Sequence, residues 1–210
     1  MAHQTALLDR IRVLLLLDAL EAADMGPVPV MRLHAFALLA DLLGPIWGVD
    51  SHDGKILKRQ GGAYYPRLQR QLDMLVGLGF VEVTNVSYAF ENGLSRLEGC
   101  FQIASGRAEE VIASVRMFSE EERAVSFLRR LAFSLQRVSL PIEKLIRVDA
   151  TWADQRTGTG DVIDFSEWKS ANYSAYSAQL FARLVDPDLK IGCGERTQLY
   201  VRLLEHRAHG

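Results

Sequence analysis

Cysteine is scarce in this sequence, which limits the sites and folds that are possible. The 210 residues include two cysteines, Cys100 and Cys193, and neither has a second cysteine or a histidine at the spacing of a zinc ligand set. The five histidines are scattered and form no His-Glu-x-x-His pattern. The sequence therefore predicts no disulfide framework, no metal centre and no cofactor, and it favours a reducing compartment.

The apolar run nearest the N-terminus is also short. The N-terminal run Val13–Leu17 is only five residues long and has charged residues on both sides, so it is too short for a membrane span and is not typical of a secretory signal. We therefore expect a cytoplasmic protein. Its 49% apolar composition is that of a soluble chain able to bury a core.

The chain carries no large excess of charge. Its formal net charge is −2, and neither half of the sequence is basic. Bulk electrostatic attraction to nucleic acid is therefore excluded, and any such contact must come from a local patch.

Motifs of common catalytic sites are absent as well. No serine lies in a Gly-x-Ser-x-Gly pattern, and the glycine-containing segment 157–161 lacks the Gly-Lys-Ser/Thr ending of a phosphate loop. We expect a protein that is not an enzyme. One alternative is a magnesium-dependent nuclease, because a set of carboxylates followed by a lysine resembles the metal-binding pattern of such enzymes. Its residues are Asp161, Asp164, Asp188 and Lys190.

The most distinctive segment present is the basic stretch 55–70, which contains five positive side chains and no acidic one. The pattern predicts a glycine-broken loop, then a helix over residues 65–77 entered through Pro66. Leu68, Leu72 and Leu75 are expected to be buried, with Arg67, Arg70 and Gln71 on the opposite side.

This basic stretch is predicted to be a recognition surface for either DNA or a partner protein. On DNA, the helix would contact base edges or backbone, the flanking cations would reach phosphates, and two tyrosines would add hydroxyl contacts. The candidate contact residues are Lys55, Lys58, Arg59, Tyr64, Tyr65, Arg67, Arg70 and Gln71.

Around this stretch, the hydrophobic pattern predicts a mainly helical chain of the α+β class. Helices over 6–22 and 30–43 precede the helix at 65–77. Three short strands follow Gly79, over 80–84, 86–90 and 94–103, and the last two form a hairpin at Asn92-Gly93. This order is that of a winged helix, predicted over 1–104. An all-helical extension is predicted over 105–210, with helices at about 106–117, 119–138, from 141, 164–184 and 196–207.

Large aromatic residues gather in the predicted C-terminal extension. Core packing is the usual place for such side chains, but an exposed subset would anchor a protein partner. The candidate partner-binding residues are Trp152, Trp168, Tyr173 and Tyr176.

The segment 31–81 resembles a known group of domains. Met31–Leu43 resembles the first helical motif of Panacea-like antitoxin domains, and residues 53–81 resemble their second motif and terminal Leu-x-x-x-Gly-hydrophobic strand. Similar winged domains occur in the middle components of bacterial ABC-three-component systems, which include the Lamassu antiviral complexes. The resemblance implies an accessory subunit that holds an SMC- or Rad50-like ATPase and an effector such as a nuclease.

The leading hypothesis is therefore a non-catalytic adaptor subunit of a bacterial antiviral defence complex, bridging ATPase and effector and contacting protein or double-stranded DNA. A stand-alone winged-helix transcriptional regulator and the magnesium-dependent nuclease are the alternatives. No membrane or small-molecule partner is expected.

Overall fold

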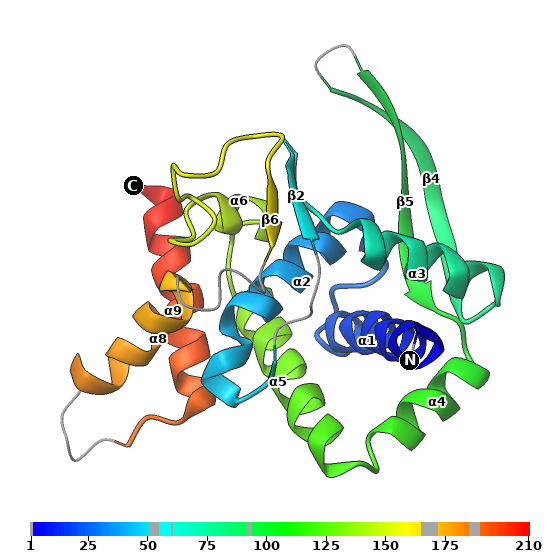
Figure 1. Cartoon of the computed structure of the whole chain (residues 1–210), viewed down its shortest axis with the longest axis horizontal. Helices are drawn as coiled ribbons and strands as arrows, with labels where there is room; N and C mark the ends of the chain where they lie inside the picture. Colours follow the sequence, from blue (N-terminus) through cyan, green and yellow to red (C-terminus); the bar gives the residue numbers. More distant parts are fainter. Residues whose placement is uncertain (1, 51–54, 60, 92–93, 165–171, 185–189) are drawn as a thin grey trace.

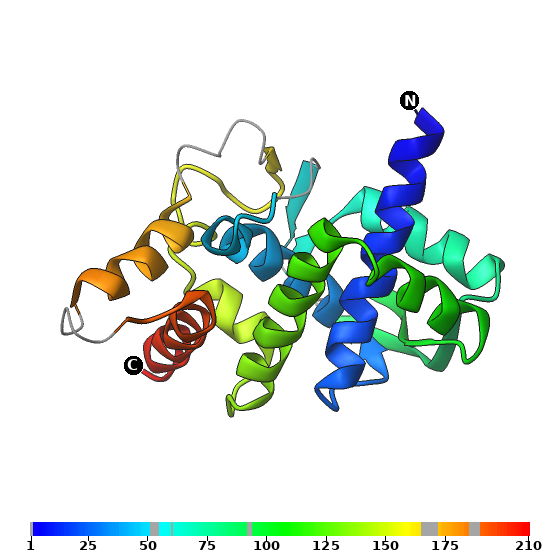
Figure 2. The ribbon, with the colours of Figure 1, turned by 90° about the horizontal axis from the view of Figure 1, so that it is seen from below.

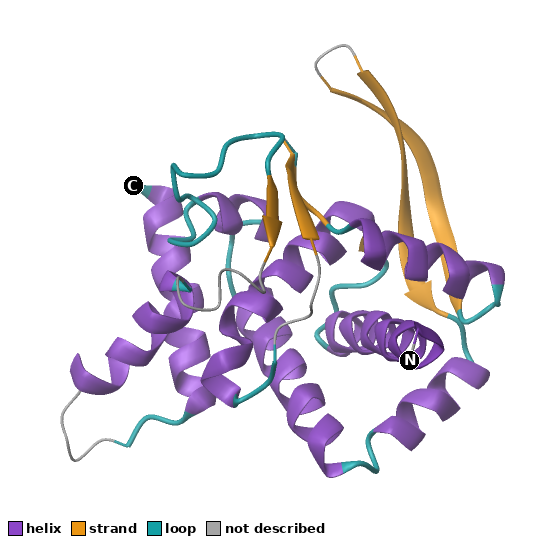
Figure 3. Ribbon diagram, viewed as in Figure 1, coloured by secondary structure: helices purple, strands orange, loops and turns teal. Residues whose placement is uncertain are grey.

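The computed structural model describes residues 2–50, 55–59, 61–91, 94–164, 172–184 and 190–210. The chain is mainly helical, with two small antiparallel sheets (Figure 1, Figure 3), as the α+β prediction requires. The elements of the N-terminal half are α1 (Ala2–Ala22), β1 (Val28–Pro29), α2 (Val30–Leu43), η1 (Gly44–Trp47), β2 (Lys55–Arg59), β3 (Gly62–Tyr64), α3 (Pro66–Gly77), β4 (Val81–Glu91) and β5 (Leu94–Ile103). Those of the C-terminal half are α4 (Arg107–Val115), α5 (Ser119–Gln136), α6 (Ile142–Arg147), β6 (Val162–Asp164), α8 (Tyr173–Leu184) and α9 (Cys193–His209).

The central element is α2, in which every residue from Leu33 to Leu43 is buried. It contacts α1, α5, α6, α8 and both sheets, which explains why its sequence is almost wholly apolar. The segment Val30–Trp47 has the length and hydropathy of a membrane span, but 72% of it is buried inside the fold. Its composition is therefore accounted for by its place in the core.

The first sheet has the order β1-β5-β4 and contains the predicted hairpin. The sequence indicated two short strands before the turn, whereas β4 is one strand interrupted by a register shift between Thr84 and Ser87. Asn85, inside this shift, has a φ of +50°, which is the geometry of a bulge. Beyond the bulge the hairpin extends away from the rest of the molecule (Figure 1).

The second sheet, of order β3-β2-β6, was not predicted. The sequence indicated a loop at Lys55–Arg59, but this segment forms β2, whose Ile56 is fully buried. Asp164, expected to begin a helix, ends strand β6, so the prediction of an all-helical C-terminal half is wrong. Each strand is too short to give a clear alternating pattern, and β2 pairs with β6 across about a hundred positions of sequence.

The C-terminal helices pack on the N-terminal elements and share their core. Contacts run between α1 and α5, between α2 and α6, and between α2 and α8. Four of the predicted C-terminal helices are found within a few residues of their expected limits, as α4, α5, α6 and α9. The N-terminal turns of α1 project beyond the neighbouring elements (Figure 2).

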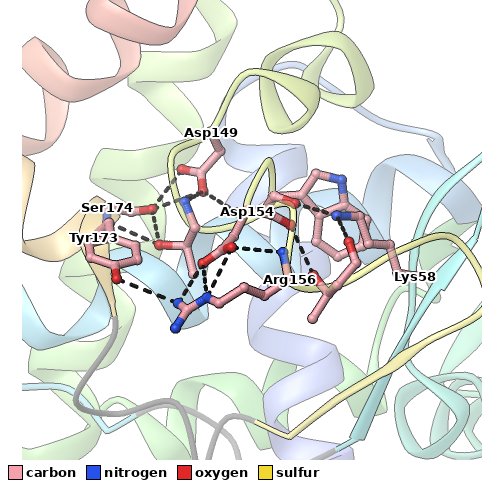
Figure 4. A network of polar contacts seen from close by, with 9 residues as sticks. Lys58, Asp149, Asp154, Arg156, Tyr173 and Ser174 are labelled. Carbon is pink, nitrogen blue, oxygen red and sulfur yellow. Dashed lines mark hydrogen bonds and ion pairs between the residues drawn. The ribbon is translucent and has the colours of Figure 1, made fainter.

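Asp149 ties three C-terminal elements together. Its buried carboxylate follows α6 and accepts hydrogen bonds from the amides of Thr151 and Trp152 at 2.9 and 3.0 Å. It also accepts from the hydroxyl of Ser174 in α8 at 2.9 Å (Figure 4). The hydroxyl of Tyr200 in α9 donates to it at 2.7 Å. Burial raises the pKa of Asp149, and these four donors oppose that effect.

Candidate interaction surfaces

Lys58, predicted to reach a partner, points into the fold instead. Its ammonium donates hydrogen bonds to the carbonyls of Trp152 at 2.6 Å and Thr157 at 2.9 Å, and it lies 5.2 Å from the Trp152 ring (Figure 4). Desolvation lowers the pKa of Lys58, while the charges of Asp154 and Asp161 act in the opposite direction. Lys58 therefore holds the segment after α6 against β2, and the prediction that it contacts a partner is corrected.

The tyrosines of the basic stretch are also used internally. Tyr65 is buried and donates its hydroxyl to Asp41 at 2.9 Å, while its amide donates to Nδ1 of His34 at 3.2 Å. Tyr64 is half-buried, and the guanidinium of Arg59 lies 3.7 Å from its ring centroid. The prediction that the Tyr65 hydroxyl contacts phosphate is thus wrong, because this buried hydroxyl donates to Asp41 of α2 instead.

His34 is part of the same buried polar contact between α2 and the start of α3. Because Nδ1 accepts from the Tyr65 amide, Nε2 carries the proton and donates to Gln69 Oε1 at 3.2 Å. Burial lowers the pKa of His34 to about 4, so the ring is neutral at pH 7.

Helix α3 presents fewer of its predicted contact residues than expected. Gln71 is buried and accepts a hydrogen bond from Nε of Arg10 at 3.1 Å, because α1 packs across this side of the helix. Arg67 is half-exposed and pairs with Asp9 of α1 at 2.6 Å. Arg70 and, in β2, Lys55 are exposed. The predicted burial of Leu72 and Leu75 is confirmed.

Of the predicted aromatic partner-binding residues, one is buried and two are exposed. Trp152 is buried against Lys58 and lies in the core, so it is not a surface anchor. Tyr173 and Tyr176 are exposed on α8, and the hydroxyl of Tyr173 accepts a 3.5 Å hydrogen bond from Arg156 (Figure 4). Trp168 lies outside the described residues.

The described residues of the predicted metal pattern do not form a metal site. Asp161 accepts a hydrogen bond from the Gly158 amide at 2.6 Å, Asp164 lies in β6, and Lys190 is exposed. Asp188 lies outside the described residues. Among the residues that are described, no three histidine, cysteine or carboxylate side chains are grouped as a metal site.

The hairpin carries an exposed apolar surface that was not predicted from the sequence. Val81 and Phe101 are buried at its base, but Val83 is 38% exposed, Val86 58% and Tyr88 69%. A Cβ placed on Gly99 would lie 2.9 Å from Cγ1 of Val83 and 3.9 Å from Cγ2 of Val86, so both valines flank the same side of β5.

Tyr88, two residues after Val86, points to the same face because side chains alternate along a strand. We call Val83, Val86 and Tyr88 the hairpin stripe. Ser87 points to the other face. The signal in the sequence was the alternation of apolar and polar residues, which the bulge at Asn85 interrupts.

On the other side of the hairpin base lies a hollow of about 260 Å³ between β4, β5, α1 and α4. Four carboxylates line it together with Arg116, which donates two 2.8 Å hydrogen bonds to Asp18. Glu21 accepts from the Ile103 amide at 2.7 Å, and burial raises the pKa of this carboxyl. This contact fixes the hairpin base to α1.

Comparison with known proteins matched no family model, no curated protein and no solved structure.

Proposed function

We propose that this chain is a non-catalytic adaptor built around a winged-helix-like N-terminal part, which joins partner proteins through its projecting hairpin. The order α1, β1, α2, α3, β4, β5, with β1 pairing with β5 in the sheet β1-β5-β4, supports the winged-helix assignment. The main departure is the insertion of η1, β2 and β3 between α2 and α3.

The observation that carries the proposal is the hairpin stripe. From their exposed fractions, Val83, Val86 and Tyr88 leave roughly 300 Å² of largely apolar side chain in water, a patch size that often marks an interaction site. At about 25 cal/mol per Å², covering this area would contribute roughly 7 kcal/mol before the costs of association. A protein partner makes better use of this surface than phosphate groups would.

The geometry of the hairpin supports the same conclusion. Beyond the pairing of β1 with Phe101 and Cys100, the described part of the hairpin is only two strands wide. Two-stranded hairpins are marginally stable in water unless a third strand or another surface packs on them. A partner that covers the stripe would therefore also stabilise the hairpin.

The partners that we propose follow from the resemblance to middle components of ABC-three-component systems. In a cytoplasmic antiviral complex of this kind, the chain would bridge an SMC- or Rad50-like ATPase and an effector. ATP hydrolysis and cleavage of nucleic acid would belong to those other subunits.

The test is co-expression with an SMC- or Rad50-like ATPase encoded beside this chain, followed by size-exclusion chromatography. We expect one stoichiometric complex, which the double substitution Val86→Glu and Tyr88→Glu abolishes. Ser87→Glu is the control, because it places one negative charge between the two test positions on the same strand, but on the opposite face. Absence of a complex, or equal loss in the control, would refute the proposed role of the stripe.

A second candidate function is DNA binding through α3, which Arg67 and Arg70 favour because both are solvent-accessible on the helix that precedes the hairpin. A stand-alone regulator should bind short duplex DNA without any other subunit, with an affinity that falls steeply as salt rises. Arg67→Ala with Arg70→Ala should then remove binding, whereas the hairpin substitutions should matter less.

A further inference from the structure

Helices α5 and α9 form a second surface that is rich in arginine. They run side by side in the same direction, since Arg130 of α5 meets Glu195 near the start of α9 and Ser139, just after α5, meets Glu205 near its end. The exposed residues that define this α5–α9 ridge are Arg123, Arg130, Phe133, Arg137, Leu199 and Arg202.

Two arginines of α5, Arg123 and Arg130, and Arg137 directly after its last residue share one face of the helix. Arg123, Arg130 and Arg137 are separated by seven residues each, which places them in a row with a spacing of about 10.5 Å. Arg123 and Arg137 form no ion pair within the described part of the chain. The positive charge of this row contrasts with the net charge of −2 of the whole protein.

Two large apolar side chains lie within this charged surface. Phe133, between Arg130 and Arg137, is 47% exposed, and Leu199 of α9 is 38% exposed. Both lie between the two points at which the helices are tied together. An apolar centre with arginine around it is the usual composition of a protein-binding surface.

The ion pairs on the ridge are accessible to exchange. Arg130 and Glu195 are 3.6 Å apart, and both side chains are about half exposed. Arg202 pairs with Glu205 at 2.6 Å, but its own side chain is 49% exposed. The exposed Arg130–Glu195 pair contributes little to stability, so a carboxylate of a partner can replace Glu195 there. Glu205 is only 15% exposed, so at Arg202 a partner carboxylate would join the pair from the exposed side of the arginine.

We propose that the α5–α9 ridge binds an acidic amphipathic helix of a partner protein. A third helix can pack against two neighbouring helices, and its apolar residues would contact Phe133 and Leu199. Glutamates repeated every seventh residue of that helix would have the same spacing as the arginines of α5. This inference rests on the adaptor function proposed above and supplies its second binding surface.

Duplex DNA fits the ridge less well. Glu195 and Glu205 lie among the arginines, where they would repel phosphates, and DNA backbone would leave Phe133 and Leu199 in water.

The test uses the whole chain and a synthetic fluorescent peptide of about four heptads, with leucine at positions a and d and glutamate at e and g. A peptide with lysine in place of each glutamate and a duplex of about 20 base pairs are the comparison probes. We expect fluorescence anisotropy to report binding of the glutamate peptide alone.

Arg130→Glu with Arg137→Glu should weaken that binding about tenfold, and Phe133→Ser should also weaken it. The matched control is Arg147→Glu with Arg183→Glu, which makes the same charge change at exposed positions on α6 and α8 and should bind normally. Thermal unfolding of each variant separates a surface effect from misfolding.

Three results would each overturn the inference. The glutamate peptide does not bind, or it binds the ridge variant and the control variant equally. The third is that the duplex binds and the ridge substitutions remove that binding. The hairpin variant Val86→Glu with Tyr88→Glu should bind the peptide like the wild type. If the ATPase complex forms but the peptide does not bind, only the inference about the α5–α9 ridge is refuted. If the peptide binds but no ATPase complex forms, only the function proposed for the hairpin is refuted.

Discussion

Removing the carboxylate of Asp149 should destabilise the whole protein, because four donors from three segments converge on it. In Asp149→Ala, Ser174 keeps a partner in Thr151, whose Oγ1 lies 2.7 Å away. The amides of Thr151 and Trp152 and the hydroxyl of Tyr200 lose their acceptor. Each such loss costs about 1–3 kcal/mol.

Part of that cost is offset, since the variant no longer buries a carboxylate whose pKa is raised by desolvation. We therefore expect a net loss of about 3 kcal/mol in the free energy of unfolding, or roughly 10 °C in Tm for a chain of this size. Urea unfolding followed by circular dichroism measures it. Asp50→Ala, at an exposed loop position, is the control and should change stability by less than about 0.5 kcal/mol.

Asp149→Asn gives an independent check through pH. Because the folded pKa of Asp149 is raised, its ionisation reduces stability as pH rises through that value. The amide cannot ionise, so the stability of the wild type relative to Asp149→Asn should fall as pH rises from below the ordinary aspartate range. A loss below about 1 kcal/mol in Asp149→Ala, or a pH-independent difference for Asp149→Asn, would refute this account of the carboxylate.

Three further outcomes follow from the buried polar contacts and the backbone. The pKa of His34 is about 4 when folded and near 6.5 when unfolded, so stability should fall by about 3 kcal/mol as pH decreases from 6.5 to 4, and His34→Gln should flatten that part of the urea-unfolding profile. Lys58→Met should cost about 1–2 kcal/mol and speed amide exchange near Thr157, with exposed Lys55→Met as the unaffected control. Gly48→Ala should cost about 1 kcal/mol in thermal unfolding because Gly48 has a φ of +65°, whereas exposed Gly77→Ala should not destabilise α3.

Much of the secondary structure could be predicted from local patterns. The limits of α2 agree with the prediction from its apolar run and the prolines before it, and the Asn-Gly pair at 92–93 in the sequence correctly indicated the β4–β5 pairing. The second sheet could not be predicted in this way. Its strands are three to five residues long, and β2 meets β6 through the pairing of Ile56 with Ile163, far apart in sequence.

In the basic stretch, the sequence could not predict which of the polar side chains are exposed. The concentration of positive charge at residues 55–70 is real, but burial decides whether a cation is available. Lys58 and Gln71 are both engaged by residues more than sixty positions away, Trp152 and Arg10 respectively. The row of arginines on α5 was visible as a seven-residue repeat, yet only the packing of α9 beside it makes a two-helix surface.

By itself, the sequence determined where most of the helices and the hairpin form, because those choices depend on neighbours within a few residues. The tertiary structure alone decided which charged and apolar side chains face solvent, because exposure depends on segments brought together from distant parts of the chain. Lys58 turns inward and Tyr88 outward for this reason.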